Sequence, residues 1–137
     1  MRDRVADNEA LTREYLVIGW GENRLDVIER ILSPDCKRHL HGAVTDGTNA
    51  AATLAAFRTA FPDASVEIEL LFGKDDHVVC RSVTHGTHKG DYLGIPASHR
   101  KVHISTVDFF RFNEHRIVES WHNVDEVGLR RDLGQIV

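Results

Sequence analysis

Residues 119–134, ESWHNVDEVGLRRDLG, combine side chains that could perform acid/base chemistry. Trp121, Asn123 and Asp125 stand at alternate positions, and alternate residues of a strand face the same side. A carboxylate removed from water beside a tryptophan binds a proton more strongly than one in water. We therefore predict a pocket wall in which Asp125 is the general acid/base and Trp121 and Asn123 contact the substrate. In the alternative interpretation, Trp121 lies in the core and Asp125 only caps the helix that follows.

The chain contains nine histidines, two of which could belong to the same pocket. His103 falls on a strand expected to run antiparallel to that of Trp121, where it could donate a hydrogen bond to an oxyanion or tune Asp125. His39, in the segment HLHG, could line the pocket. Hydrogen bonding at the surface or in the core is the alternative for each. We predict no metal, because the chain lacks an HExxH helix and HLHGAVTDG lacks the downstream glutamate of a cupin.

Length and composition are typical of one globular domain over residues 1–137. The chain is 42% hydrophobic, and its 17 basic and 21 acidic residues leave a formal charge of −4, which argues against nucleic-acid binding. Cys36 and Cys80 are the two cysteines, and their spacing suggests neither a disulfide framework nor a zinc site. The charged start MRDRVADNEALTRE is unlike a signal peptide, and no apolar run reaches the ~18 residues of a membrane helix. We expect a soluble, cytoplasmic protein.

Hydrophobic spacing predicts helices in the first half of the chain and strands in the second. Leu11, Tyr15 and Ile18 form one helical stripe, whereas Val66, Ile68 and Leu70 alternate with glutamates as in a half-exposed strand. The expected helices cover 8–20, a segment capped by Asn23 and closed by Pro34, 48–61, and a tail from 125. The expected strands are 36–42, a strand around 66–70, 77–88, 101–112 and 116–124. Helices followed by antiparallel strands predict an α+β fold.

The segment DFFRF, residues 108–112, bears on oligomeric state. Adjacent residues of a strand face opposite sides, so an outward Phe110 or Phe112 would meet water unless a partner covered it. A homodimer or a higher homo-oligomer is the simplest such partner. If helices covered both faces of the sheet, no partner would be needed.

Four segments occur in an order that resembles the SnoaL-like polyketide cyclases of the nuclear transport factor 2-like superfamily. They are FPD at 61–63, GTHKG at 86–90, LGIP at 93–96 and DFFRFNEHRIVESWHNVDEVGLRRDLG at 108–134. The resemblance implies a cone-shaped α+β barrel, in which a curved, mostly antiparallel sheet packs on three N-terminal helices around an apolar pocket. It also implies that Asp125 is the acid/base of an intramolecular aldol condensation, and that His88, in the matched GTHKG, holds substrate carbonyls.

The resemblance implies a cofactor-independent enzyme that acts on a polycyclic aromatic or other apolar small molecule. Alternatives within the superfamily are a cofactor-independent hydroxylase and a hydrolase similar to limonene epoxide hydrolase, for which Arg81, Asp108 and Asp125 could form the required set. Arg81 is otherwise expected to contact substrate, and Asp108 to pair with Arg111 or Arg116 at the sheet surface. A noncatalytic module that binds a small molecule in the same cone is a further alternative.

Overall fold

Six strands form one curved sheet in the computed structural model, which describes residues 3–40 and 42–135. The strands are β1 (Leu32–Leu40), β2 (Ala43–Asp46), β3 (Ser65–Lys74), β4 (His77–Thr87), β5 (Lys101–Asn113) and β6 (Arg116–Val124). Their order in the sheet is β2-β1-β6-β5-β4-β3. Only the pairing of β1 with β6 is parallel among these strands. The sheet therefore has β6 and β5 at its centre.

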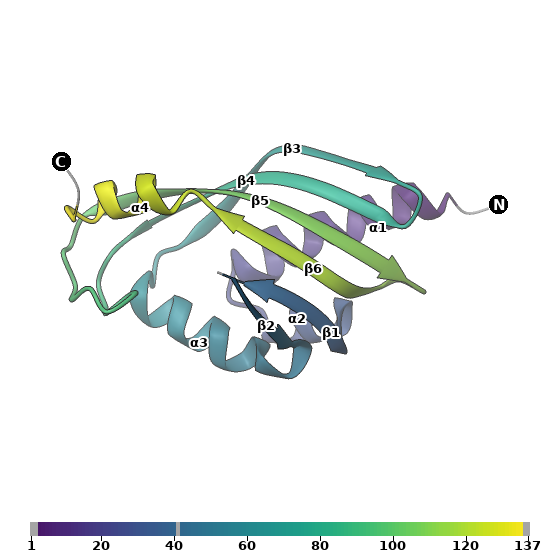
Figure 1. Cartoon of the computed structure of the whole chain (residues 1–137), viewed down its shortest axis with the longest axis horizontal. Coiled ribbons are helices and arrows are strands. Elements are labelled where there is room, and N and C mark those ends of the chain that lie inside the picture. The colour runs from purple at the N-terminus through teal and green to yellow at the C-terminus, as the bar shows by residue number, and fades with distance from the viewer. Residues whose placement is uncertain (1–2, 41, 136–137) are drawn as a thin grey trace.

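Most of the helices lie against one side of this sheet, with α3 below the strands and α1 behind them, whereas α4 lies beyond the end of β6 (Figure 1). They are α1 (Arg4–Arg13), its π-helical continuation η1 (Glu14–Trp20), α2 (Leu25–Ile31), the short η2 (Gly47–Asn49), α3 (Ala50–Ala60) and α4 (Glu126–Asp132). Asp3 caps α1, because its carboxylate accepts a hydrogen bond from Val5 N at 3.0 Å. No helix in the described part of the chain has the length and apolar character needed to cross a membrane.

The predicted α+β architecture is confirmed, with differences at the ends of elements. Arg24 rather than Asn23 occupies the N-cap position of the second helix, and its side chain makes no capping hydrogen bond; Asn23 has a positive φ of 59°. This helix ends at Ile31, and Leu32 and Pro34 already belong to β1. The short strand β2 was not predicted. The strand expected over 36–42 includes position 41, which lies outside the described residues.

A β-bulge in β3 reverses which side chains of the strand point to the inner face of the sheet. Its register with β4 shifts between Ile68 and Leu70, so Leu71 takes the inner position that simple alternation assigns to Leu70. Leu70 is exposed. The prediction that Leu70 shares a face with Val66 and Ile68 is therefore wrong, because an inserted residue moves all later side chains to the opposite face.

Side chains from the inner sheet face and the helices form two hydrophobic clusters. In the larger one, Tyr15 of η1 packs edge-on against Phe110 of β5, with ring centroids 5.6 Å apart. In the smaller one, Phe61 at the end of α3 packs against Tyr92 with centroids 4.9 Å apart. The two clusters fix η1 and α3 against the sheet and leave a cavity between them.

The outer sheet face carries Phe109, which is 41% exposed. Phe110 and Phe112 are buried on the inner face, so the expectation that one of them points outward is wrong. Strand register aligns Phe109 with Trp121 of β6 on one side and Val79 of β4 on the other. An apolar row thus crosses the outer face, and a homo-oligomer that covers it remains a prediction.

We expect the protein to migrate at about twice its chain mass of 15.5 kDa in size-exclusion chromatography with light scattering. The substitution Phe109→Lys should shift it to the monomer mass, because it places a charge in the middle of the apolar row. Val127→Lys, at an exposed apolar position of α4, is the matched control and should leave the mass unchanged. A wild-type protein that is monomeric at ~100 μM would contradict the prediction.

Candidate active site

A cavity of about 390 Å³ lies between the inner face of the sheet, η1, α3 and the segment 92–93. Its lining is mostly apolar, with a few polar groups from neighbouring strands, an arrangement typical of small-molecule sites. The polar side chains are Tyr15, Arg38, Thr53, Ser82, Thr84, Tyr92, Thr106, Asp108, Ser120 and His122. Apolar walls come from Leu16, Trp20, Leu40, Ala56, Phe57, Val66, Leu93, Ile104, Phe110 and Val124.

Asp108 and His122 form a hydrogen-bonded pair in the cavity wall. They face each other across the β5–β6 ladder, and His122 Nδ1 donates to Asp108 Oδ1 at 2.6 Å. Asp108 is 4% exposed, whereas 33% of the His122 side chain remains accessible. Because the bond places the proton on Nδ1, Nε2 is the nitrogen that carries the lone pair in neutral His122.

The environment of His122 raises the pKa of its imidazole above the usual 6.5. Burial is the largest single influence and opposes protonation. The charge of Asp108 and its hydrogen bond act in the opposite direction and together outweigh burial, while the positive charge of Arg38 lowers the pKa slightly. The result is a base that binds its proton more tightly than a histidine in water.

Two hydroxyl groups continue the polar network behind Asp108. Thr106 Oγ1 donates a long hydrogen bond of 3.5 Å to Asp108 Oδ2, and Ser82 Oγ lies 2.8 Å from Thr106 Oγ1. Both hydroxyls are buried, and β4 and β5 place them opposite each other. They orient the Asp108 carboxylate toward His122.

Tyr15 of η1 offers a neutral hydroxyl in the cavity lining. Burial raises the pKa of its phenol to about 12, and the charge of Arg38 lowers it only in part. The phenol therefore keeps its proton at neutral pH and can donate a hydrogen bond to a ligand oxygen.

Asp125 does not line this cavity. It is exposed at the start of α4, where its Oδ1 accepts a hydrogen bond from Gly128 N at 3.0 Å. The expected placement in a pocket wall is therefore wrong, and the capping alternative describes the residue. A carboxylate in water lacks the desolvation that the predicted base required.

Trp121 and Asn123 point to the outer face, opposite to their expected direction. The inner positions of β6 are Ser120, His122 and Val124, which line the cavity. His39 stacks on Trp121 from β1, with ring centroids 5.3 Å apart and planes 2° from parallel. The side chains of β6 alternate as predicted, but the set that faces the cavity is shifted by one residue from the predicted set.

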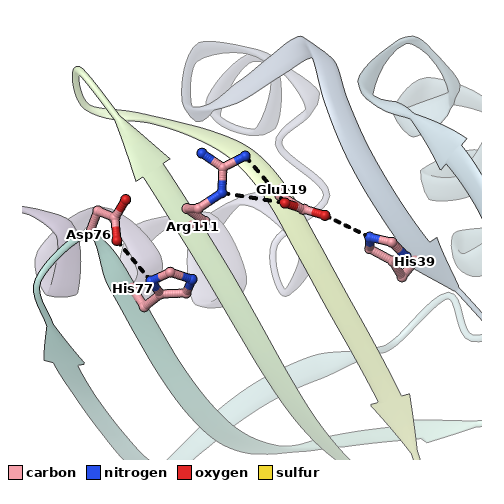
Figure 2. Close-up of polar contacts among 5 residues, drawn as sticks. All are labelled: His39, Asp76, His77, Arg111 and Glu119. Atoms are coloured by element: carbon pink, nitrogen blue, oxygen red, sulfur yellow. Dashed lines mark hydrogen bonds and ion pairs between the residues drawn. The ribbon is translucent and has the colours of Figure 1, made fainter.

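The outer face holds a polar network around Glu119, drawn in Figure 2. His39 Nε2 donates to Glu119 Oε2 at 2.9 Å, and Arg111 approaches the other oxygen at 3.2 Å. The His39 hydrogen bond is the main reason that the pKa of Glu119 is below its usual value. Nearby, His77 bonds to Asp76 at 2.8 Å. His39 and Arg111 thus belong to a surface network, and the expected positions of His39 in the pocket and of Arg111 beside Asp108 are wrong.

Three further predicted residues also lie away from the cavity. Arg81 is exposed on the outer face, 3.4 Å from Glu69. His103 is exposed beside His85, with their Nδ1 atoms 2.9 Å apart. His88 is fully buried, where its Nδ1 accepts from Ser98 N at 3.1 Å and anchors the segment between β4 and β5.

The arginine and two aspartates of an epoxide hydrolase-like set do not meet in this structure. Arg81 is on the outer face, Asp125 caps α4, and Asp108 bonds to His122 inside. Arg116, the other expected partner of Asp108, donates instead to the Glu29 carbonyl at 2.8 Å. Within 3–40 and 42–135, no three His, Cys, Asp or Glu side chains group as metal ligands. The absence of a metal and of a cofactor remains a prediction.

The fold agrees with what comparisons with known proteins show. The model of the SnoaL-like polyketide cyclase family matches residues 10–133, and the chain belongs to this family. No protein of curated function matches the sequence. Among solved structures, TsrD from Streptomyces laurentii is 24% identical over 99% of this chain and 100% of its own, with a TM-score of 0.88.

Two other solved structures extend this comparison. AclR from Streptomyces galilaeus, described as a proposed hydroxylase, is 25% identical with a TM-score of 0.87, covering 97% of this chain and 99% of its own. IdmH from Streptomyces antibioticus, described as a proposed polyketide cyclase, is 22% identical with a TM-score of 0.83. The match covers 93% of this chain and 98% of the IdmH chain. Membership of this family supports the conclusion that the protein is an enzyme that acts on small polyketide-like molecules. The family does not specify the reaction, which has to be inferred from the side chains that line the cavity.

Proposed function

We propose that the protein is a cofactor-independent polyketide cyclase that closes a ring by intramolecular aldol condensation, with His122 as acid/base. The observation that carries this proposal is the Asp108–His122 pair in the wall of an apolar cavity. Nε2 of neutral His122 takes a proton from a carbon between two carbonyls. Asp108 stabilises the imidazolium that results, as a buried carboxylate does for a catalytic histidine.

The remaining steps use donors already present in the cavity. The enolate oxygen accepts hydrogen bonds from neutral Tyr15 and from Ser120, which both line the cavity. The carbanion attacks a second carbonyl to form the new carbon–carbon bond, and the alkoxide takes the proton back from His122. Apolar walls exclude water and hold the substrate folded. The proposed base is thus His122, supported by Asp108, and not Asp125.

A pH profile tests this assignment. Ring closure needs neutral His122, so kcat/KM should rise with pH through a midpoint above 6.5, because the folded-state pKa of His122 is raised. Asp108→Asn removes the charge that raises this pKa, so the midpoint should move to lower pH. Product formation from an anthraquinone with a 1,3-dicarbonyl side chain, followed by chromatography and mass spectrometry, gives the rates. An unchanged midpoint in Asp108→Asn would contradict the assignment.

Hydroxylation is the second candidate, favoured by the 25% identity to AclR. Both reactions begin with removal of the same proton. Hydroxylation then needs molecular oxygen and a two-electron reductant, so that one oxygen atom enters the product and the other leaves as water, whereas the aldol product is an isomer of the substrate. A noncatalytic binding module would bind the anthraquinone and release it unchanged. Product mass therefore identifies hydroxylation, and chromatographic retention separates the isomeric aldol product from anthraquinone released unchanged.

A further inference from the structure

Arg38 is a buried cation in the cavity wall that the proposed proton transfer does not use. It lies on the inner face of β1 and is 4% exposed. Its Nη1 is buried and has no hydrogen-bond partner among the described residues. Burying a guanidinium without an anion is unfavourable, because its lost hydration is not replaced.

The protein's own groups do not neutralise Arg38. Its only close ring contact in the described structure is with Trp20, whose centroid is 5.9 Å from the guanidinium carbon. No described carboxylate comes within 4.0 Å of the guanidinium. Asp108 is the one carboxylate among the described lining residues, and its oxygens accept from His122 and Thr106. The negative charge inside the cavity is therefore already engaged.

Strand register places Arg38 close to the proposed base. Arg38 is opposite Ser120 in the parallel β1–β6 pair, and His122 is the next inner residue of β6. The charge of Arg38 acts on His122, since it lowers the imidazole pKa in part. Once His122 is protonated, the cavity wall holds two cations and one carboxylate. An anionic group on the ligand would restore the balance.

We propose that the natural substrate carries a carboxylate and that Arg38 binds it. The planar guanidinium fork matches the two oxygens of a carboxylate, and such charge-assisted pairs are stronger in an apolar site than in water. The inference rests on the proposed function and makes it more specific: the free acid, rather than its ester, is the substrate. Binding at Arg38 would hold the acidic carbon beside His122 on the adjacent strand.

Matched ligands test this inference without requiring turnover. The probes are 3-hydroxy-2-naphthoic acid and its methyl ester, titrated calorimetrically into the full chain at pH 8. We expect the acid to bind about tenfold or more tightly than the ester. Arg38→Met should remove this preference while changing the affinity for the ester less than about threefold. Arg38→Lys should keep part of the preference, because it retains the charge without the fork.

Two controls separate a specific contact from general effects. Arg81→Met removes an exposed arginine on the outer face and should leave the preference for the acid intact. Arg38→Met should also raise the melting temperature of the ligand-free protein, because it replaces a buried unpaired charge with an apolar side chain. A higher melting temperature would show that this variant is folded when its binding is measured.

Three results would overturn the inference. They are equal affinities for acid and ester, a preference that survives in Arg38→Met, and no binding of either probe. Equal affinities with reduced ring closure in Arg38→Met would mean that Arg38 recognises only the enolate formed during the reaction. None of these results changes the expected pH profile of ring closure. The proposal that the substrate carries a carboxylate can therefore be disproved while the cyclase proposal holds.

Discussion

Replacing His122 by asparagine is expected to lower kcat for ring closure by about 10² to 10⁴. The asparagine amide can still donate to Asp108, as Nδ1 does over 2.6 Å, but it has no basic nitrogen in the place of Nε2. Substrate affinity should change little, since the apolar walls and Arg38 are untouched. Single-turnover rates and calorimetric affinities measure the two quantities separately.

The matched control for this prediction is Asp125→Asn. Asp125 lies outside the cavity, and asparagine caps helices about as well as aspartate. Both kcat and stability should therefore stay close to wild type. If Asp125→Asn abolished turnover and His122→Asn did not, the acid/base would be Asp125, and the geometry of the cavity would have indicated the wrong residue.

Much of the fold follows from patterns that depend on local geometry. Alternating apolar and charged residues predicted β3, and the 3.6-residue spacing of Leu54, Phe57 and Phe61 predicted α3. Less predictable features arise from contacts far apart in the sequence. The bulge before Leu70 depends on pairing with β4, and the early start of β1 at Leu32 depends on pairing with Ile117.

Most of the predicted site residues lie on strands that border the cavity, but on the face of the sheet that is turned away from it. Trp121 and Asn123 flank His122, which lines the cavity, and Arg81 precedes Ser82, which also does. A strand's period of two requires alternate residues to share a face, but it does not specify which set faces inward. Only the packing of α3 and η1 selects the inner set. Over residues 119–124 of β6, the set Ser120, His122 and Val124 and the set Glu119, Trp121 and Asn123 each contain one apolar and two polar residues, so composition could not decide.

The Asp108–His122 pair could not be placed from the sequence alone, because it depends on the register of the β5–β6 hairpin. A hairpin closed by NEH at 113–115 would pair Phe112 with Arg116, so residues that sum to 228 would face each other and Asp108 would lie opposite Ser120. In the structure the register shifts between Arg111 and Phe112, and beyond the shift residues that sum to 230 face each other, which places Asp108 opposite His122. A buried carboxylate opposite a histidine is an unusual pair for a half-exposed sheet. The sequence does not reveal the cavity, because its volume depends on how far the helices stand from the sheet.

Phe61→Ala is expected to lower the free energy of unfolding by about 3–5 kcal/mol. Phe61 is fully buried at the end of α3, where its ring contacts Phe57, His88 and Tyr92. These contacts join α3 to the segment between β4 and β5 that borders the cavity. Removing the ring leaves a void that neighbours fill only in part, because β4 and α3 fix their positions. Urea denaturation followed by circular dichroism measures the change.

Phe72→Ala is the matched control, because Phe72 is 50% exposed on the edge strand β3. Its loss should cost less than about 1 kcal/mol, as is usual for surface positions. A domain of this size is stable by only ~5–15 kcal/mol, so Phe61→Ala should also weaken binding at the cavity by loosening Tyr92. Equal destabilisation by the two substitutions would mean that Phe61 does not anchor the cavity wall, and that α3 is held mainly through the larger cluster around Tyr15 and Leu54.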